Sequence, residues 1–66
     1  MSLAPHQQRV VDEYAEVDER ARKLDAFIKT ETFASLDVED CALMRQQLRA
    51  MAQYAHLLNQ RIARFQ

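Results

Sequence analysis

The chain has 66 residues, a net charge of −1, one cysteine and no glycine. That length allows one small domain, which without a disulfide, a metal or partner subunits retains at most about 3–5 kcal/mol of net stability, and a single cysteine excludes an internal disulfide. The lack of glycine excludes glycine-rich phosphate loops, and the net charge argues against binding to DNA or RNA, which needs an excess of positive charge.

Residues 5–30 are predicted to form the first helix. Pro5 suits a first helical turn, where its missing N–H would have had no partner. The apolar residues then recur at alternating spacings of four and three, as in a coiled-coil seam: Val10, Tyr14, Val17, Ala21, Leu24 and Ile28. Acidic side chains precede basic ones by four residues in three predicted pairs: Glu16 with Arg20, Asp18 with Arg22, and Glu19 with Lys23.

Residues 31–37 are predicted to be a turn, because short polar and β-branched residues favour turns and caps. Phe33 and Leu36 are expected to fold over the end of the helix pair, and Asp37 to cap the second helix. That helix is predicted over about residues 38–65. Its seam is again spaced by three and four: Cys41, Met44, Leu48, Met51, Ala55, Leu58, Ile62 and Phe65.

Two long helices joined by a short turn predict one domain over residues 1–66, an all-α antiparallel two-helix hairpin. A second apolar set lies beside the two seams, and a hairpin has only one shared interface. We therefore expect a homo-oligomeric helical bundle, at minimum a four-helix homodimer. The residues expected at the oligomer interface are Val11, Phe27, Leu43, Ala50, Tyr54 and Leu57.

Charge is divided unevenly along the chain. Residues 1–40 hold all ten acidic side chains and five basic ones, whereas residues 41–66 hold four arginines and no acidic residue. The basic second half has two interpretations, which the sequence leaves open. It meets an anion, or it meets the acidic half of a neighbouring subunit.

No constellation of residues predicts an enzyme. Cys41 lies on the seam as a small buried hydrophobe, His56 falls outside both apolar sets, and the carboxylates form a solvated helix face with basic partners. His6 and His56 are too far apart to share a metal site, so we expect neither a metal nor a cofactor. No apolar run reaches the length of a membrane span, and the N-terminus does not resemble a secretion signal, which predicts a cytoplasmic protein.

A small anionic ligand is compatible with the side chains present. Without glycine loops a phosphate needs arginine or lysine side chains, and a base needs an aromatic surface on which to stack. The same aromatic residues are also typical of core and interface packing. The candidate ligand-binding residues are Tyr14, Lys29, Arg45, Arg49, Tyr54 and Arg61.

Five segments carry a resemblance to a known group of proteins. They are Arg9-Val10-Val11-Asp12-Glu13, Leu24-Asp25-Ala26-Phe27-Ile28, Phe33 with Leu36, Arg45-Gln46-Gln47-Leu48 with Met51 and Tyr54, and Arg61-Ile62-Ala63-Arg64-Phe65. In this order and spacing they resemble short tailed-phage proteins with the same helix–turn–helix outline. Two positions depart from that group: Ala4 replaces a capping Ser or Thr before Pro5, and Leu36-Asp37 replaces a Leu-Pro opening of the second helix.

The resemblance implies a phage accessory protein of the counter-defence kind. One mode known for such proteins is an oligomer that traps a cyclic nucleotide or an ADP-ribose derivative between its subunits, and this is the function we expect here. The alternative mode is a small inhibitor that binds a host defence or regulatory protein through its exposed apolar stripe. A structural component of the phage is the third interpretation.

Overall fold

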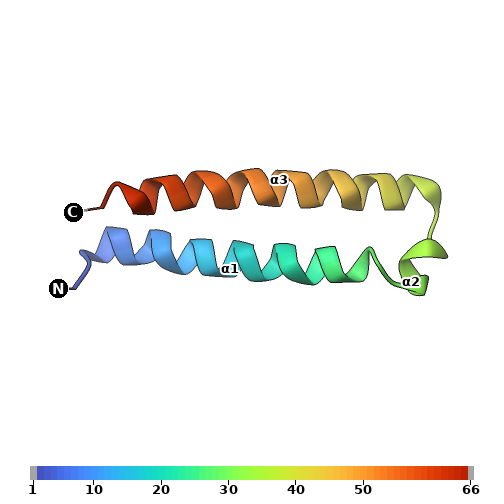
Figure 1. Ribbon diagram of the computed structural model, residues 1–66, viewed down its shortest axis with the longest axis horizontal. Coiled ribbons are helices and arrows are strands. Elements are labelled where there is room, and N and C mark those ends of the chain that lie inside the picture. Colours follow the sequence, from blue (N-terminus) through green and yellow to red (C-terminus); the bar gives the residue numbers. More distant parts are fainter. Residues whose placement is uncertain (1, 66) are drawn as a thin grey trace.

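The computed structural model describes residues 2–65 and contains three helices in that range. Helix α1 spans Pro5–Phe27, the one-turn helix α2 spans Glu31–Ala34, and helix α3 spans Val38–Ala63. Helices α1 and α3 run antiparallel side by side, α2 crosses between them at one end, and both chain ends lie at the other (Figure 1). The result is a rod of 49 × 15 × 14 Å. The predicted all-α hairpin is confirmed for these residues.

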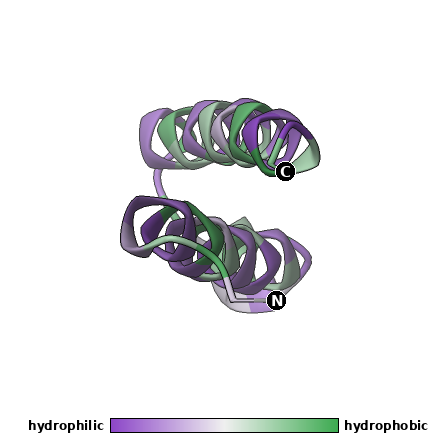
Figure 2. Ribbon diagram, turned by 90° about the vertical axis from the view of Figure 1, so that its left-hand side faces the viewer, coloured by the Kyte–Doolittle hydropathy of each residue, from purple (hydrophilic) through white to green (hydrophobic). Residues whose placement is uncertain are grey.

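The seams predicted from the sequence form the contact between the helices. Val10 and Val17 of α1 and Leu58 of α3 are buried, and the other seam residues of both helices are at least partly buried. Tyr14, Met51, Ala55, Ile62 and Phe65 pack against this cluster. Viewed along its length, the hairpin is one layer of two helices whose ribbons alternate hydrophilic and hydrophobic residues, as expected for amphipathic helices (Figure 2).

Helix α1 begins at Pro5 although Ala4 offers no side chain that could cap it. The Gln7 side chain compensates, because its Oε1 accepts a hydrogen bond from the Ala4 backbone N–H at 2.9 Å. Two of the three predicted helix-surface ion pairs form: Asp18 with Arg22, and Glu19 with Lys23. Glu16 and Arg20 form no salt bridge within residues 2–65.

The turn is more ordered than the sequence predicted. Helix α1 ends at Phe27 rather than near residue 30, and α2 occupies part of the segment predicted as a plain turn. Thr30 causes both differences. Its hydroxyl donates to the Phe27 carbonyl at 2.7 Å and accepts from the Phe33 N–H at 3.2 Å, so it closes one helix and caps the next.

A second cluster of side chains lies inside the turn. Phe33 is 3% exposed, and its ring meets the ring of Phe27 edge-on, with centroids 6.1 Å apart. The Arg45 guanidinium lies 5.1 Å from the centre of the same Phe33 ring. The Cys41 thiol donates to the Phe33 carbonyl at 3.3 Å. Phe33 thus ties α1, α2 and α3 together, in agreement with the prediction that it folds over the helix ends.

Asp37 opens α3 as predicted. Its backbone is extended, and its carboxylate accepts from the Glu39 N–H at 3.2 Å. The helix therefore starts at Val38 without the proline expected from the resemblance. No residue in the described range has a positive φ angle, so the chain reverses direction without the left-handed conformation that glycine usually supplies.

Candidate functional site

An open groove runs between the two long helices on one flank of the hairpin. Its volume is about 310 Å³. The small side chains Ala21, Ala52 and Ala55 keep the helices from filling it. The residues that line it are Tyr14, Asp18, Ala21, Ala52, Ala55, His56 and Asn59. A groove with an apolar floor and a few polar groups at its rim is the usual setting for a small ligand.

Tyr14 and Asp18 form the α1 side of the groove. Tyr14 packs against the Val10–Val17–Leu58 core, so its ring is held in place where it lines the groove. Asp18 Oδ2 accepts a hydrogen bond from Arg22 Nε at 2.8 Å. This bond raises the pKa of the Arg22 guanidinium. The Asp18 carboxylate at the rim of the groove is therefore paired with a permanent positive charge.

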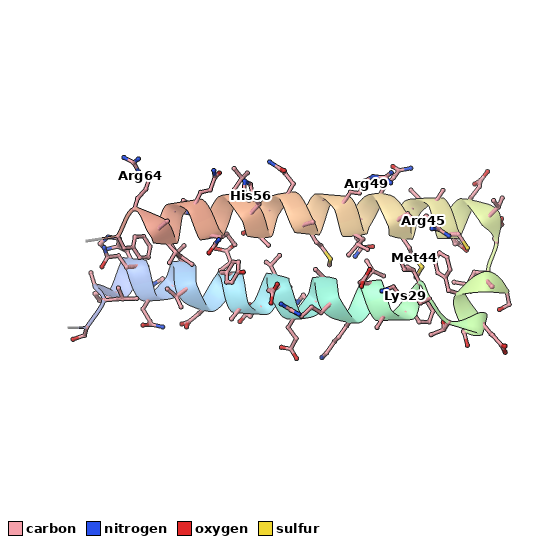
Figure 3. All side chains as sticks on the ribbon, viewed as in Figure 1. Lys29, Met44, Arg45, Arg49, His56 and Arg64 are labelled. Carbon is pink, nitrogen blue, oxygen red and sulfur yellow. The ribbon has the colours of Figure 1, made fainter. Side chains whose placement is uncertain are left out.

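Two arginines lie on the flank of α3 next to the groove, although neither of them lines it. Arg45, Arg49, Ala52 and His56 follow one another at spacings of four, three and four, which puts them on one flank of α3. Ala52 and His56 line the groove, so this is the groove flank. Arg49 is exposed and makes no salt bridge within residues 2–65. Figure 3 shows Arg49 on the side of α3 that faces away from α1, and Arg49 does not line the groove.

Two of the predicted ligand residues already have partners near the turn (Figure 3). Arg45 lies over the Phe33 ring, and Lys29 Nζ lies 3.2 Å from Asp25 Oδ2. Both side chains therefore contribute to the local structure of a single hairpin. Among residues 2–65, Arg49 makes no contact of this kind.

Tyr54 and Arg61 lie away from the groove. Arg49 and Tyr54 are five residues apart, which turns them by about 140° around the axis of α3. A single hairpin consequently does not bring the six predicted ligand residues together. It places Tyr14 and Arg49 on the groove flank, Lys29 and Arg45 at the turn, and Tyr54 and Arg61 on the other flank of α3.

The groove contains residues that the sequence analysis did not select. The sequence predicts Asp18 in a surface ion pair with Arg22, places His56 outside both apolar sets, and does not single out Asn59. The alanines were the available signal: Ala21 lies on the α1 seam and Ala55 on the α3 seam, and small seam residues on both helices leave space between them. Antiparallel pairing had to be known before they could be aligned.

The residues predicted at an oligomer interface fall into two groups. Val11 and Phe27 are half-buried within one chain, and Phe27 contacts Phe33. The four on α3 are exposed to solvent: Leu43, Ala50, Tyr54 and Leu57. Leu43 is 61% exposed, Tyr54 43% and Leu57 49%, which leaves a contiguous apolar surface outside the hairpin. Their role in assembly stays a prediction.

Two other kinds of site are not found in the part of the chain that the structure describes. No group of three or more His, Cys, Asp or Glu side chains within residues 2–65 is arranged to hold a metal ion. None of the helices there is long and apolar enough to cross a bilayer.

The fold and the groove define a small helical-hairpin protein with a polar-rimmed groove on one flank and an apolar surface on the other. A family model described as Sequestin matches residues 4–64, which is nearly the whole chain. The chain therefore belongs to the Sequestin family. A comparison with curated proteins found no match, and a comparison with solved structures found none either.

Proposed function

We propose that this protein is a non-enzymatic phage accessory factor that sequesters a nucleotide-derived immune signal and so counters host defence. Its family is named Sequestin, and the name suggests sequestration. The observation that carries the proposal is the groove, which presents the Tyr14 ring, with Arg49 nearby on α3, exposed and without a salt bridge among residues 2–65.

The groove suits a cyclic nucleotide or an ADP-ribose derivative in two respects. The Tyr14 ring offers a flat surface against which a base can stack, and stacking contributes about 1–3 kcal/mol per base. Arg49 offers a charged fork for phosphate oxygens. Asp18 and Asn59 supply polar groups for the sugar and base edges. Since α3 has no acidic residue beyond Asp40, nothing on that helix repels an anion near Arg49.

A second copy of the chain completes the site in this proposal. The groove is open to solvent along one side, so a single hairpin covers only part of a bound nucleotide. A sequestering protein must bind tightly enough to lower the free concentration of its ligand, which favours enclosure. We therefore place the ligand between subunits, where a second copy covers the open side of the groove.

Isothermal titration calorimetry tests the proposal. Cyclic dinucleotides, cyclic trinucleotides and ADP-ribose derivatives are titrated into the full chain, and at least one class is expected to bind. Tyr14→Leu should weaken that binding by removing the stacking surface, and Arg49→Gln by removing a phosphate contact. Arg9→Gln is the matched control, because Arg9 is an exposed arginine on α1 about 140° around the helix from Tyr14.

Absence of binding heat with every class of nucleotide would overturn the proposal. Equal losses from Arg49→Gln and Arg9→Gln would overturn the site, because they would reduce the role of Arg49 to overall charge. Circular dichroism of each variant checks that Tyr14→Leu, which changes a residue packed on the core, still folds.

A second candidate function rests on a different observation, the exposed Leu43, Tyr54 and Leu57 of α3. An apolar helix face of this kind is typical of a helix that binds a groove on another protein. In this alternative the protein inhibits a host defence or regulatory protein. A pull-down from host lysate separates the two functions: an inhibitor recovers one protein in stoichiometric amount, whereas a nucleotide trap recovers none.

A further inference from the structure

One face of α3 carries apolar residues at heptad spacing, with Gln47 and Arg61 at two of the positions, and the hairpin itself does not use this face. We call it the α3 stripe. Its residues are spaced by four and three, and all are exposed: Leu43, Gln47, Ala50, Tyr54, Leu57 and Arg61. The same spacing continues for one step at each end, to Asp40 and to Arg64, which are also exposed. This is the pattern of a coiled-coil seam, on the opposite flank of α3 from the groove.

Helix α1 offers no matching surface. Among residues 2–65 the exposed large hydrophobic side chains are Leu3, Val38, Leu43, Tyr54 and Leu57, and none of them belongs to α1. The exposed residues of α1 are mainly charged or polar. The counterpart of the α3 stripe in a second copy of this chain is therefore another α3 stripe.

We propose that two copies of the chain pair through their α3 stripes in antiparallel orientation, about a twofold axis that passes near residue 52. In this register each pair of facing residues has numbers that are symmetric about 52. Ala50 faces Tyr54 of the second copy, Gln47 faces Leu57, Leu43 faces Arg61, and Asp40 faces Arg64. In heptad notation, residues 40, 47, 54 and 61 are a positions, and residues 43, 50, 57 and 64 are d positions. Every layer of the antiparallel pair therefore joins an a position of one copy to a d position of the other, as antiparallel coiled coils require.

The centre of this interface combines a small side chain with a large one. Ala50 faces Tyr54 twice, once on each side of the twofold axis, which lets each tyrosine ring lie over an alanine instead of meeting another ring. Leu57 is covered by the aliphatic part of Gln47, and Leu43 by the stem of Arg61, whose charged end stays in solvent. All the apolar residues of the stripe are covered.

Charge fixes the orientation. The acidic residues of α3 lie in its first turn, at Glu39 and Asp40, and the last turn carries Arg61, with Arg64 directly after it. Antiparallel pairing brings Asp40 of each copy to Arg64 of the other and forms two equivalent ion pairs. Parallel pairing brings Asp40 to Asp40, Arg61 to Arg61 and Tyr54 to Tyr54, which places like charges at both ends.

This inference does not depend on which ligand the groove binds. It identifies one contact of the oligomer that the proposed function requires, and it leaves the groove open because the groove lies on the opposite flank of α3. The pair of hairpins is the four-helix unit from which any larger assembly is built. Its tests measure association without nucleotide, so their failure is distinct from a failure to bind nucleotide.

Sedimentation equilibrium of the full chain at micromolar concentration is the first test. The expected species is a dimer or a multiple of it. Tyr54→Glu places a charge at the centre of the stripe and should shift the chain to monomers that remain helical by circular dichroism. A folded monomer as the only species of the unmodified chain would overturn the inference, and so would an unchanged oligomer in Tyr54→Glu.

A charge-reversal cycle tests the register. Asp40→Arg and Arg64→Asp each bring like charges together twice per dimer and should each raise the dissociation constant of the dimer by about tenfold or more. The double variant Asp40→Arg/Arg64→Asp restores opposite charges and should recover most of the affinity. Arg9→Asp, a charge reversal on the exposed face of α1, is the control and should leave the dissociation constant unchanged.

Rescue in the double variant can arise only between copies. Asp40 and Arg64 are about 36 Å apart along α3, far beyond the reach of two side chains within one hairpin. Parallel pairing predicts no rescue, since each substitution then exchanges one like-charged pair for another. Independent losses that add in the double variant would overturn the antiparallel register.

Cysteine cross-linking gives a second measure of the register that does not rely on charge. In a Cys41→Ser background, a Gln47→Cys chain mixed with a Leu57→Cys chain should form an intermolecular disulfide, because these positions face each other. Either chain alone should not, because positions 47 of the two copies lie about 15 Å apart along the interface, too far for a disulfide. Efficient cross-linking of Gln47→Cys by itself would overturn the proposal.

Discussion

Leu58 is the most completely buried side chain of the described residues, and the stability of the hairpin is concentrated around it. It is 2% exposed and lies with Val10 and Val17 at the centre of the only buried cluster of side chains between α1 and α3 in that range. In so small a core, no neighbouring layer exists to take over its contacts when it is removed.

Leu58→Ala should lower the free energy of unfolding by about 2–5 kcal/mol, because it removes buried methyl groups and leaves a cavity. That is comparable to the whole stability of a domain this size, so most of the helical signal in circular dichroism should be lost at ambient temperature. Gln53→Ala, an exposed position on the same helix, is the control and should keep the signal. A helical, cooperatively melting Leu58→Ala would show that the core lies elsewhere.

Arg45 is expected to act through the turn and not through a ligand. Its guanidinium over the Phe33 ring is worth about 0.5–1 kcal/mol. Arg45→Gln should therefore lower the free energy of unfolding by that amount, and the urea midpoint with it, measured without any ligand present. Arg49→Gln, four residues away and without such a contact, should leave the midpoint where it is. If the two variants behaved alike, the contact with Phe33 would have no energetic role.

At the scale of the elements, the long helices and the residues at which they begin could be predicted from the sequence, whereas the end of α1 could not. The apolar spacing of four and three is a property of each helix and needs no knowledge of its partner. The end of α1 at Phe27 depends instead on the Thr30 hydroxyl, which hydrogen-bonds to the Phe27 carbonyl on one side and to the Phe33 N–H on the other. A side chain that can close one helix or open another has the same sequence signal in either case.

The short helix α2 also explains how the chain turns without glycine. The reversal is divided between two changes of direction, one before α2 and one after it. At each, a C-cap residue with right-handed helical angles ends one helix (Ile28, then Ser35), and an extended N-cap residue begins the next (Thr30, then Asp37). Single-residue reversal through a left-handed conformation is not used in the described range. The sequence indicated a turn at this place, but the alternation of caps depends on Phe33 being buried between the helices.

Thr30→Ala tests the double cap. The variant loses both hydroxyl hydrogen bonds and should lower the free energy of unfolding by about 0.5–2 kcal/mol, as measured by urea denaturation. Thr32→Ala is a matched control, since Thr32 is exposed on α2 and its hydroxyl makes no hydrogen bond among residues 2–65. Equal effects of the two substitutions would contradict the role given to Thr30.

At the scale of the whole molecule, the hairpin has a thin core for its length. One layer of two helices buries four large side chains in the described range, Val10, Val17, Phe33 and Leu58. The proposed pairing of two copies buries more apolar surface and stabilises the folded state by mass action. The midpoint of thermal unfolding should therefore rise with protein concentration when followed by circular dichroism. A midpoint that is independent of concentration would mean that one hairpin is stable alone.

The candidate site was only partly accessible to sequence analysis, for a reason that belongs to this scale. Tyr14 and Arg49 could be selected by chemistry, and both lie on the groove flank. Tyr54 and Arg61 passed the same chemical criteria and lie on the other flank. Distance between side chains on two helices depends on how the helices are rotated against each other, and residue type contains no information on that rotation.

The rod-like outline of the hairpin affects how the protein moves through solution. Its radius of gyration is 15.1 Å, compared with about 11 Å expected for a compact globule of this length. A lone hairpin experiences more friction than a sphere of its mass and should elute from a size-exclusion column before globular standards of the same mass. Side-by-side pairing along α3 doubles the mass but adds width rather than length, so the elution volume should change by less than it does when a sphere doubles its mass. Light scattering measures molar mass independently of molecular shape, so the values expected for one copy and for two copies differ by a factor of two.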